Sequence, residues 1–136
     1  MAKNTHFLWH SALVAGLILI SGCDKNFSSE PGTLQGVISI GPLCPVQKDP
    51  PDPGCLPTRE TYNAYPVDVL TPRGIKVTRL DPALDGSYET TLEPGHYFIV
   101  LETGHTGIGS SNLPAEVVIT SKDKKIFNIN IDTGIR

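Results

Sequence analysis

Apolar and polar residues alternate with a period of two from Thr33 onward, which is the pattern of half-buried β-strands. Gly, Pro, Asn and Asp interrupt the alternation at short intervals, and these residue types favour turns. The pattern predicts seven strands, at Thr33–Ile40, Tyr65–Leu70, Ile75–Asp81, Ser87–Leu92, His96–Thr103, Ala115–Ser121 and Lys125–Asp132. No helical periodicity is visible after residue 23. We therefore predict an all-β fold, a single seven-stranded antiparallel β-sandwich over residues 33–136.

One predicted strand carries apolar residues on both of its faces. Tyr97, Ile99 and Leu101 are expected to face the core, whereas Phe98 and Val100 alternate with them and face away. An apolar residue on an outward face either packs under a loop or belongs to an interface patch. The sequence leaves both alternatives open for Phe98 and Val100.

The segment 41–63 departs from the alternation. It carries six prolines between Pro42 and Pro57, and because proline lacks a backbone N–H, the segment cannot lie inside a sheet. A rigid loop loses little conformational entropy on binding, which suits it to recognition. The exposed side chains expected in and beside this loop form a candidate binding surface, composed of Lys48, Arg59, Tyr62 and Tyr65. The alternative is a loop that only caps one end of the sandwich.

The first 22 residues have the parts of a secretory signal peptide. Lys3 gives a positive start, Ala12–Ile20 is an apolar run of nine residues, and Ser21-Gly22 supplies small residues before a cleavage point. The run is shorter than the ~20 apolar residues that a transmembrane helix needs. Leu19 to Cys23 (LISGC) resembles the lipobox of bacterial lipoproteins. An uncleaved anchor, or an ordinary signal peptide with an incidental cysteine, is the alternative.

The lipobox resemblance implies a lipid anchor. Cys23 would become the first residue of the mature protein and carry a diacylglyceryl thioether, with further acylation such as palmitate on its new amine. Residues 23–32 would form a polar tether, and the protein would sit on the non-cytoplasmic side of the bacterial cell envelope, bound to a membrane. Asp24 resembles an inner-membrane retention signal.

Two cysteines remain once Cys23 is assigned to lipid. Cys44 and Cys55 would then form a disulfide bond, because an envelope compartment is oxidising. A metal site is the alternative. It would need further ligands, and the sequence has no histidine between residues 11 and 95.

Charge and motifs limit the classes of function. Residues 23–136 contain ten Lys and Arg against fourteen Asp and Glu, a formal charge of −4, which argues against binding nucleic acid. We find no cofactor motif and expect no cofactor, no metal and no catalytic site. The alternative is a small envelope hydrolase or metal-dependent enzyme that uses His96 or His105, although neither histidine has a recognisable ligand or triad spacing.

Two motifs carry a resemblance to a known family of domains. The stretch Leu84–Tyr88 (LDGSY) followed by Leu92–Val100 (LEPGHYFIV) resembles the pattern of carboxypeptidase regulatory-like domains. These domains belong with the transthyretin-like and collagen-adhesin B-type sandwiches, so the resemblance implies a transthyretin-like fold. A fold does not determine a function. Together with the lipobox, it leads us to expect a lipid-anchored, non-enzymatic binding or structural module for an envelope protein or a carbohydrate.

Overall fold

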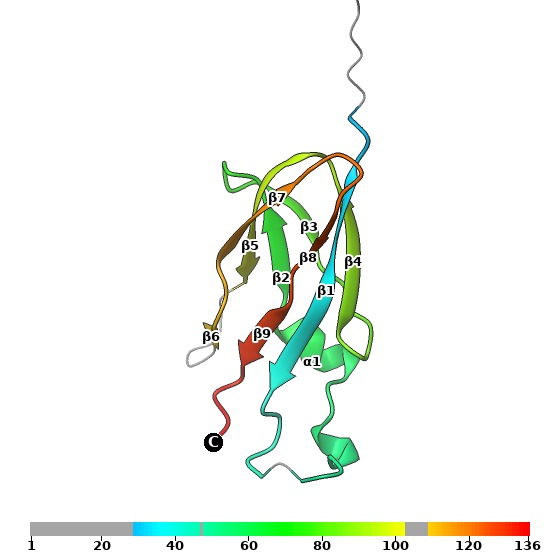
Figure 1. The fold of residues 1–136 in the computed structure, drawn as a ribbon. Coiled ribbons are helices and arrows are strands. Elements are labelled where there is room, and N and C mark those ends of the chain that lie inside the picture. The colour runs from blue at the N-terminus through cyan, green and yellow to red at the C-terminus, as the bar shows by residue number, and fades with distance from the viewer. Residues whose placement is uncertain (1–28, 47, 103–108) are drawn as a thin grey trace, which may run out of the picture.

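Two β-sheets packed face to face form the protein (Figure 1). The structure is a computed structural model that describes residues 29–46, 48–102 and 109–136. Within these residues the strands are β1 Gly32–Gly41, β2 Val67–Leu70, β3 Lys76–Arg79, β4 Ser87–Leu92, β5 Gly95–Leu101, β6 Gly109–Ser110, β7 Ala115–Ile119, β8 Lys124–Ile126 and β9 Ile129–Asp132. Two short helices, η1 Pro53–Cys55 and α1 Arg59–Ala64, lie between β1 and β2. The predicted all-β sandwich is confirmed.

The strand order shows one difference from the purely antiparallel sandwich that we predicted. The second sheet has the order β3-β2-β5-β7, and all of its pairs are antiparallel. The first sheet has the order β4-β1-β9-β6, with β8 also paired to β1. It is mixed, because β8 and β9 run parallel to β1 while β4 runs antiparallel to it. Alternation within one strand carries no information about the direction of its neighbour, so the sequence pattern could not reveal this.

The predicted last strand is two strands, β8 and β9, because its pairing with β1 is interrupted at Phe127 and Asn128; both strands lie along the same edge of β1, opposite β4, in one register. At the interruption, the backbone of Phe127 lies against Gly36, where an added Cβ would be 2.0 Å from the Phe127 carbonyl oxygen. Two hydrogen bonds hold this segment to β1 where the regular strand pairing is missing. The N–H of Phe127 donates to the Gln35 carbonyl (2.9 Å), and the N–H of Val37 donates to Asn128 Oδ1 (3.0 Å). Only glycine fits at position 36 without displacing a strand.

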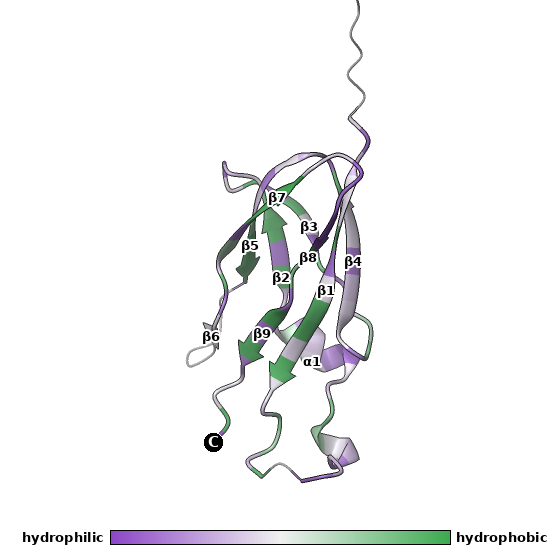
Figure 2. Ribbon diagram, viewed as in Figure 1, coloured by the Kyte–Doolittle hydropathy of each residue, from purple (hydrophilic) through white to green (hydrophobic). Residues whose placement is uncertain are grey.

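The core lies between the sheets and follows the predicted alternation. Figure 2 shows apolar residues alternating with polar ones along β1 and β9. Both sheets contribute fully or almost fully buried side chains, which are Leu34, Ile38, Ile40, Tyr88, Leu92, Ile129 and Ile131 from the first sheet and Val67, Val69, Tyr97, Ile99, Val117 and Ile119 from the second. Burial of these apolar side chains is the main stabilising contribution to the fold.

The helix α1 replaces the start of a predicted strand. We expected no helix and a strand from Tyr65, but Arg59–Ala64 is helical and β2 begins only at Val67. Thr58 and Thr61 form a reciprocal cap: the Thr61 N–H donates to Thr58 Oγ1 (3.3 Å), and the Thr58 N–H donates to Thr61 Oγ1 (3.0 Å). A helix of six residues is too short to show a helical hydrophobic period, and this explains the wrong prediction.

The two ends of the sandwich differ in what they carry. The chain enters β1 at one end, and the segment that contains η1 lies at the opposite end, on the same side as the C-terminus (Figure 1). No helix in the described part of the chain is both long enough and apolar enough to cross a membrane.

Candidate binding surfaces

The cystine loop, residues 42–58, forms the end of the sandwich opposite the start of β1 (Figure 1). Cys44 and Cys55 are joined by a disulfide bond with their Cα atoms 5.6 Å apart, so the predicted disulfide is confirmed in preference to the metal site. Within the ring, Asp52 caps η1 through its Oδ1, which accepts a hydrogen bond from the Gly54 N–H (2.9 Å). The disulfide, the prolines and this cap restrict the backbone of the loop.

The surface of the cystine loop is partly apolar. Val46 is 69% exposed and Leu56 is 50% exposed, and Lys48 is exposed between them in sequence. A hollow of about 240 Å³ opens beside the disulfide and is lined by Leu43, Cys44, Lys48, Pro51, Asp52, Cys55 and Leu56. The hollow therefore combines apolar walls with one basic and one acidic side chain.

Tyr62 and Tyr65 do not belong to an exposed binding surface, contrary to our expectation. Tyr62 is only 6% exposed, because α1 turns its ring into the core, where its hydroxyl lies next to Gly86. Burial raises the pKa of the Tyr62 phenol, and the nearby Asp85 carboxylate raises it further. Tyr65 is half-buried and packs against the core.

Arg59 is exposed, but its guanidinium is already engaged by the loop that follows β3. Its Nη1 lies 2.6 Å from Asp81 Oδ1 and donates to the Pro82 carbonyl (2.9 Å). These contacts tie α1 to that loop. Of the four predicted surface residues, Lys48 and Arg59 are exposed, and only Lys48 lines the hollow of the cystine loop.

The other predicted site residues fall into two groups. Cys23, Asp24 and His105 lie outside the described residues. His96 is exposed on β5, and its Nδ1 lies 2.8 Å from Glu116 Oε1 on β7. In the described ranges, no three His, Cys, Asp or Glu side chains come together in a group that could hold a metal ion.

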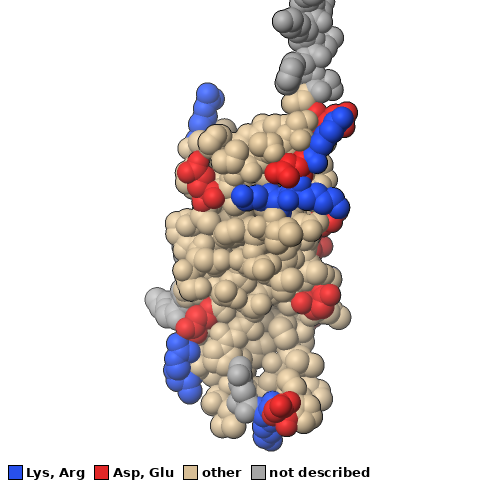
Figure 3. All heavy atoms as spheres, viewed as in Figure 1, with Lys and Arg blue, Asp and Glu red and all other residues tan. Residues whose placement is uncertain are grey.

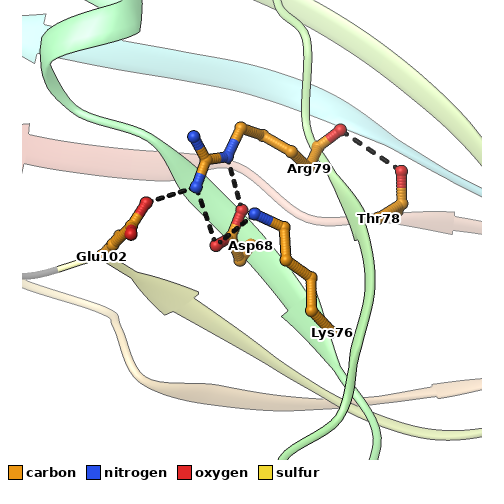
Figure 4. A network of polar contacts seen from close by, with 5 residues as sticks. All are labelled: Asp68, Lys76, Thr78, Arg79 and Glu102. Carbon is orange, nitrogen blue, oxygen red and sulfur yellow. Dashed lines mark hydrogen bonds and ion pairs between the residues drawn. The ribbon is translucent and has the colours of Figure 1, made fainter.

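A buried acid on the outer side of the second sheet was missed by the sequence analysis. Asp68 lies between two core residues of β2, so it points away from the core, yet it is only 6% exposed. Arg79 donates from Nε to Oδ1 (2.7 Å) and from Nη2 to Oδ2 (3.0 Å), and Lys76 Nζ lies 2.9 Å from Oδ2. Arg79 also pairs with Glu102 (Figure 4).

The charge cluster around Asp68 has a clear electrostatic consequence. The hydrogen bonds from Arg79 lower the pKa of Asp68, and the hydrogen bond and charge of Lys76 lower it further, which outweighs the effect of burial. The same contacts raise the pKa of Arg79. No sequence signal could have found this cluster, because an acid between two strand valines is expected to face solvent.

The outer face of the second sheet has an apolar centre. We call it the second-sheet face and define it by the outward side chains of β3, β2, β5 and β7. Phe98 is 36% exposed and Val118 is 42% exposed, and Leu70 and Val100 are partly buried beside them. Phe98 and Val100 thus lie on an open sheet face, not under a described loop.

The outer face of the first sheet, in contrast, is polar. Figure 3 views the molecule from the side of β1 and β9, and its Lys, Arg, Asp and Glu side chains lie mainly toward the two ends with a broad uncharged zone between them. The outward residues of this face are mostly hydroxyls and amides, namely Thr33, Gln35, Ser39, Ser87, Thr91, Asn128 and Asn130. The exceptions are the apolar Val37 and Ile126 and the charged Glu89, Lys124 and Asp132.

Comparisons with known proteins give a weak likeness only. No protein-family model and no curated protein matches the sequence. Among solved structures, the chain is similar to a minor pilin of Streptococcus agalactiae (TM-score 0.49, 13% identity, covering 76% of this chain and 44% of that chain). It is also similar to the TIE protein of Bacillus anthracis (TM-score 0.48, 13% identity, 76% and 17%) and to a DUF3823 family protein from Parabacteroides merdae (TM-score 0.46, 16% identity, 76% and 46%). The chain spans less than half the length of each, and the likeness adds no argument about function.

Proposed function

We propose that this protein is a lipid-anchored protein of the bacterial cell envelope, in which a non-enzymatic β-sandwich presents the cystine loop to an envelope protein or a carbohydrate. The proposal includes cleavage before Cys23, acylation of that cysteine, and a sandwich of the carboxypeptidase regulatory-like, transthyretin-like type. One observation carries it: the cystine loop and the start of β1 lie at opposite ends of the sandwich (Figure 1). A lipid on Cys23 would therefore leave the loop at the end away from the bilayer.

The physical properties of the cystine loop support a role in recognition. A covalently closed, proline-rich loop has few conformations to lose on binding, so more of its contact energy becomes affinity. Val46 and Leu56 offer apolar contacts on this loop, and Lys48 offers a charge. Tyr62 has no part in the contact because it belongs to the core.

Capture of a partner from membranes tests the role of the loop. The full chain is cross-linked in cells, purified from membranes, and its co-purified proteins are quantified by mass spectrometry, while a glycan array tests carbohydrates. We expect Val46→Asp to remove the bound partner with no change in melting temperature, because Val46 is exposed and makes few contacts. Ile126→Asp is the matched control, since Ile126 on β8 is 65% exposed and lies outside the loop. Equal capture by wild type and Val46→Asp would contradict the proposal.

Labelling tests the anchor separately from the loop. Cells are given an alkyne analogue of palmitate, and the purified chain is examined for the label and for its intact mass. We expect label on the wild-type chain and none on Cys23→Ser, since a hydroxyl cannot replace the nucleophilic thiolate. Retention at the inner membrane is proposed from Asp24, and Asp24→Ser is expected to move the protein in membrane fractionation. Label that persists on Cys23→Ser would remove the anchor from the proposal.

A further inference from the structure

We propose that the second-sheet face is the contact surface between two copies of this chain. The copies would be related by a two-fold axis that lies between their two stacked sheets, runs parallel to the strands, and passes over the gap between β2 and β5. The two copies would stack their second sheets face to face, as the two sheets of a sandwich do. This inference uses only described residues and does not depend on the lipid anchor or on the cystine loop.

The first argument is the apolar centre of the second-sheet face. The register pairs Leu70 with Phe98 in the middle of the sheet, and Val100 and Val118 lie on either side of Phe98 along the strands. Phe98 and Val118 remain 36% and 42% exposed. A contiguous apolar area on an open sheet face, rimmed by charged side chains, is typical of a protein contact surface.

The second argument is the position of charge at the two edges of this face. The backbone register places Lys76 opposite Leu70, Leu70 opposite Phe98, and Phe98 opposite Glu116. These four residues therefore form one row across the sheet, with a basic side chain on edge strand β3 and an acidic one on edge strand β7. Both ends of the row remain accessible, because the Lys76 side chain is 46% exposed and the Glu116 side chain is 52% exposed.

The proposed axis turns this row into a complementary contact. Rotation about an axis between β2 and β5 places β3 over β7 of the second copy and β2 over β5, while each level along the strands is kept. Lys76 then faces Glu116 of the second copy, and Leu70 faces Phe98. Packed sheets lie ~10 Å apart, a distance that a lysine and a glutamate can bridge together. The row complements itself, so the occupant is a second copy of this chain.

The charge cluster around Asp68 favours this contact in two ways. The carboxylate of Asp68 on β2 binds the side chains of Lys76 and Arg79, which reach toward it from β3, so both stay on the second-sheet face (Figure 4). It also offsets their charge, together with Glu102. Two copies of the face therefore meet without strong repulsion between like charges.

Zero-length cross-linking of the full chain tests the proposed contact. An equal mixture of unlabelled and ¹⁵N-labelled chain is treated with a carbodiimide, which joins a lysine amine directly to a carboxylate. Lys76 and Glu116 of one copy lie on strands separated by three inter-strand spacings, ~14 Å, so they cannot be linked within one chain. We expect a Lys76–Glu116 peptide that contains one labelled and one unlabelled half. Absence of this mixed peptide would overturn the proposal.

Substitutions separate the two arguments. Glu116→Lys and Lys76→Glu each remove one partner of the cross-link, so the dimer fraction of every variant is measured by analytical ultracentrifugation. Each substitution should lower the dimer fraction about tenfold by placing like charges together, and combining them should restore it. Phe98→Asp should also abolish the dimer, by burying an unpaired charge. The matched control is Val37→Asp, because Val37 is 40% exposed on the outer face of the first sheet. A dimer yield that survives Phe98→Asp, or that falls equally in Val37→Asp, would refute a contact through this face.

Discussion

The outer faces of the two sheets differ, although their inner faces contribute to one core in the same manner. The outer face of the first sheet carries hydroxyls and amides, whereas the second-sheet face carries Phe98, Val118 and a buried acid. Both inner faces are apolar. The apolar residues at every second position of each strand specify the sandwich, whereas the residues at the alternate, outward positions determine which surface can bind another molecule.

The two sheets also differ in what holds their strands in place. The first sheet depends on backbone contact, because the backbone of Phe127 passes so close to Gly36 that no side chain fits there. The second sheet depends on side-chain charges, because Arg79 and Lys76 from β3 bind Asp68 on β2. The four predictions below test these differences.

The largest expected effect is at the close contact between Gly36 and Phe127 in the first sheet. Gly36→Ala places a Cβ against the Phe127 carbonyl group, so β1 or the β8–β9 segment must move. We expect the free energy of unfolding to fall by about 3 kcal/mol, at the upper end of the cost of overpacking. Urea unfolding followed by circular dichroism measures it. Gly41→Ala is the control, since nothing lies within 4 Å of an added Cβ at that end of β1, and its effect should be near zero. Equal losses at both positions would show that the close contact is not the cause.

The second effect concerns the buried acid of the second sheet. Asp68→Asn keeps the size of the side chain but removes the charge that Arg79 and Lys76 bind. We expect a loss of about 2 kcal/mol at pH 7, within the range for hydrogen bonds to charged groups.

The effect of Asp68→Asn should depend on pH in a defined direction. Because the pKa of Asp68 is lowered in the folded protein, its stabilisation is fully present above the unfolded pKa of about 4. It is lost as the pH falls through the lower, folded pKa, so the difference between wild type and variant should shrink in acid. Asp132→Asn is the control and should cost less, because Asp132 pairs with Arg136 on the exposed surface. A difference that grows toward acid pH would contradict the role of Asp68.

The third effect returns to the first sheet. The Tyr88 hydroxyl donates to the Phe127 carbonyl at 2.5 Å, and Tyr88→Phe leaves that carbonyl without this donor. We expect a loss of about 1.5 kcal/mol.

Burial raises the pKa of Tyr88 to about 12, so the wild type should lose stability between the unfolded pKa near 10 and this value as the pH rises. Thermal unfolding from pH 8 to 11 should show a smaller alkaline loss in Tyr88→Phe. An identical alkaline profile would contradict the assignment.

The smallest effect compares the two outer faces directly. Phe98→Thr should cost about 1 kcal/mol, because part of the ring is buried on the second-sheet face. Val37→Thr should cost less than about 0.5 kcal/mol, because the outer face of the first sheet provides few apolar neighbours. Melting temperatures at a concentration where the chain is monomeric measure both values. A larger loss for Val37→Thr would reverse the comparison.

The strand pattern was predictable because it rests on local alternation. Each predicted strand overlaps an observed one, and core residues such as Leu34, Ile38 and Ile99 follow from the period of two. The disulfide between Cys44 and Cys55 was also predictable, because the predicted lipid on Cys23 would leave only these two cysteines to pair. These inferences need no knowledge of which strands are neighbours.

The candidate surfaces were only partly predictable. Lys48 lies where the sequence indicated, but Tyr62 is buried because the short helix α1 turns its ring into the core. The sequence indicated Phe98 and Val100 as outward apolar residues and left open whether a loop covers them. The row from Lys76 to Glu116 could not be foreseen, since it depends on strand order and register across β3, β2, β5 and β7.

The sequence alone determined the class of fold, most core residues of the strands and the cystine loop, because alternation, proline content and cysteine number act through local geometry. The tertiary structure decided that β8 and β9 run parallel to β1, that Asp68 is buried, and that Lys76 and Glu116 lie at opposite edges of one sheet face. These features depend on contacts between residues far apart in the chain. A period of two shows which side chains of a strand face the core, but it does not show which strand lies beside it.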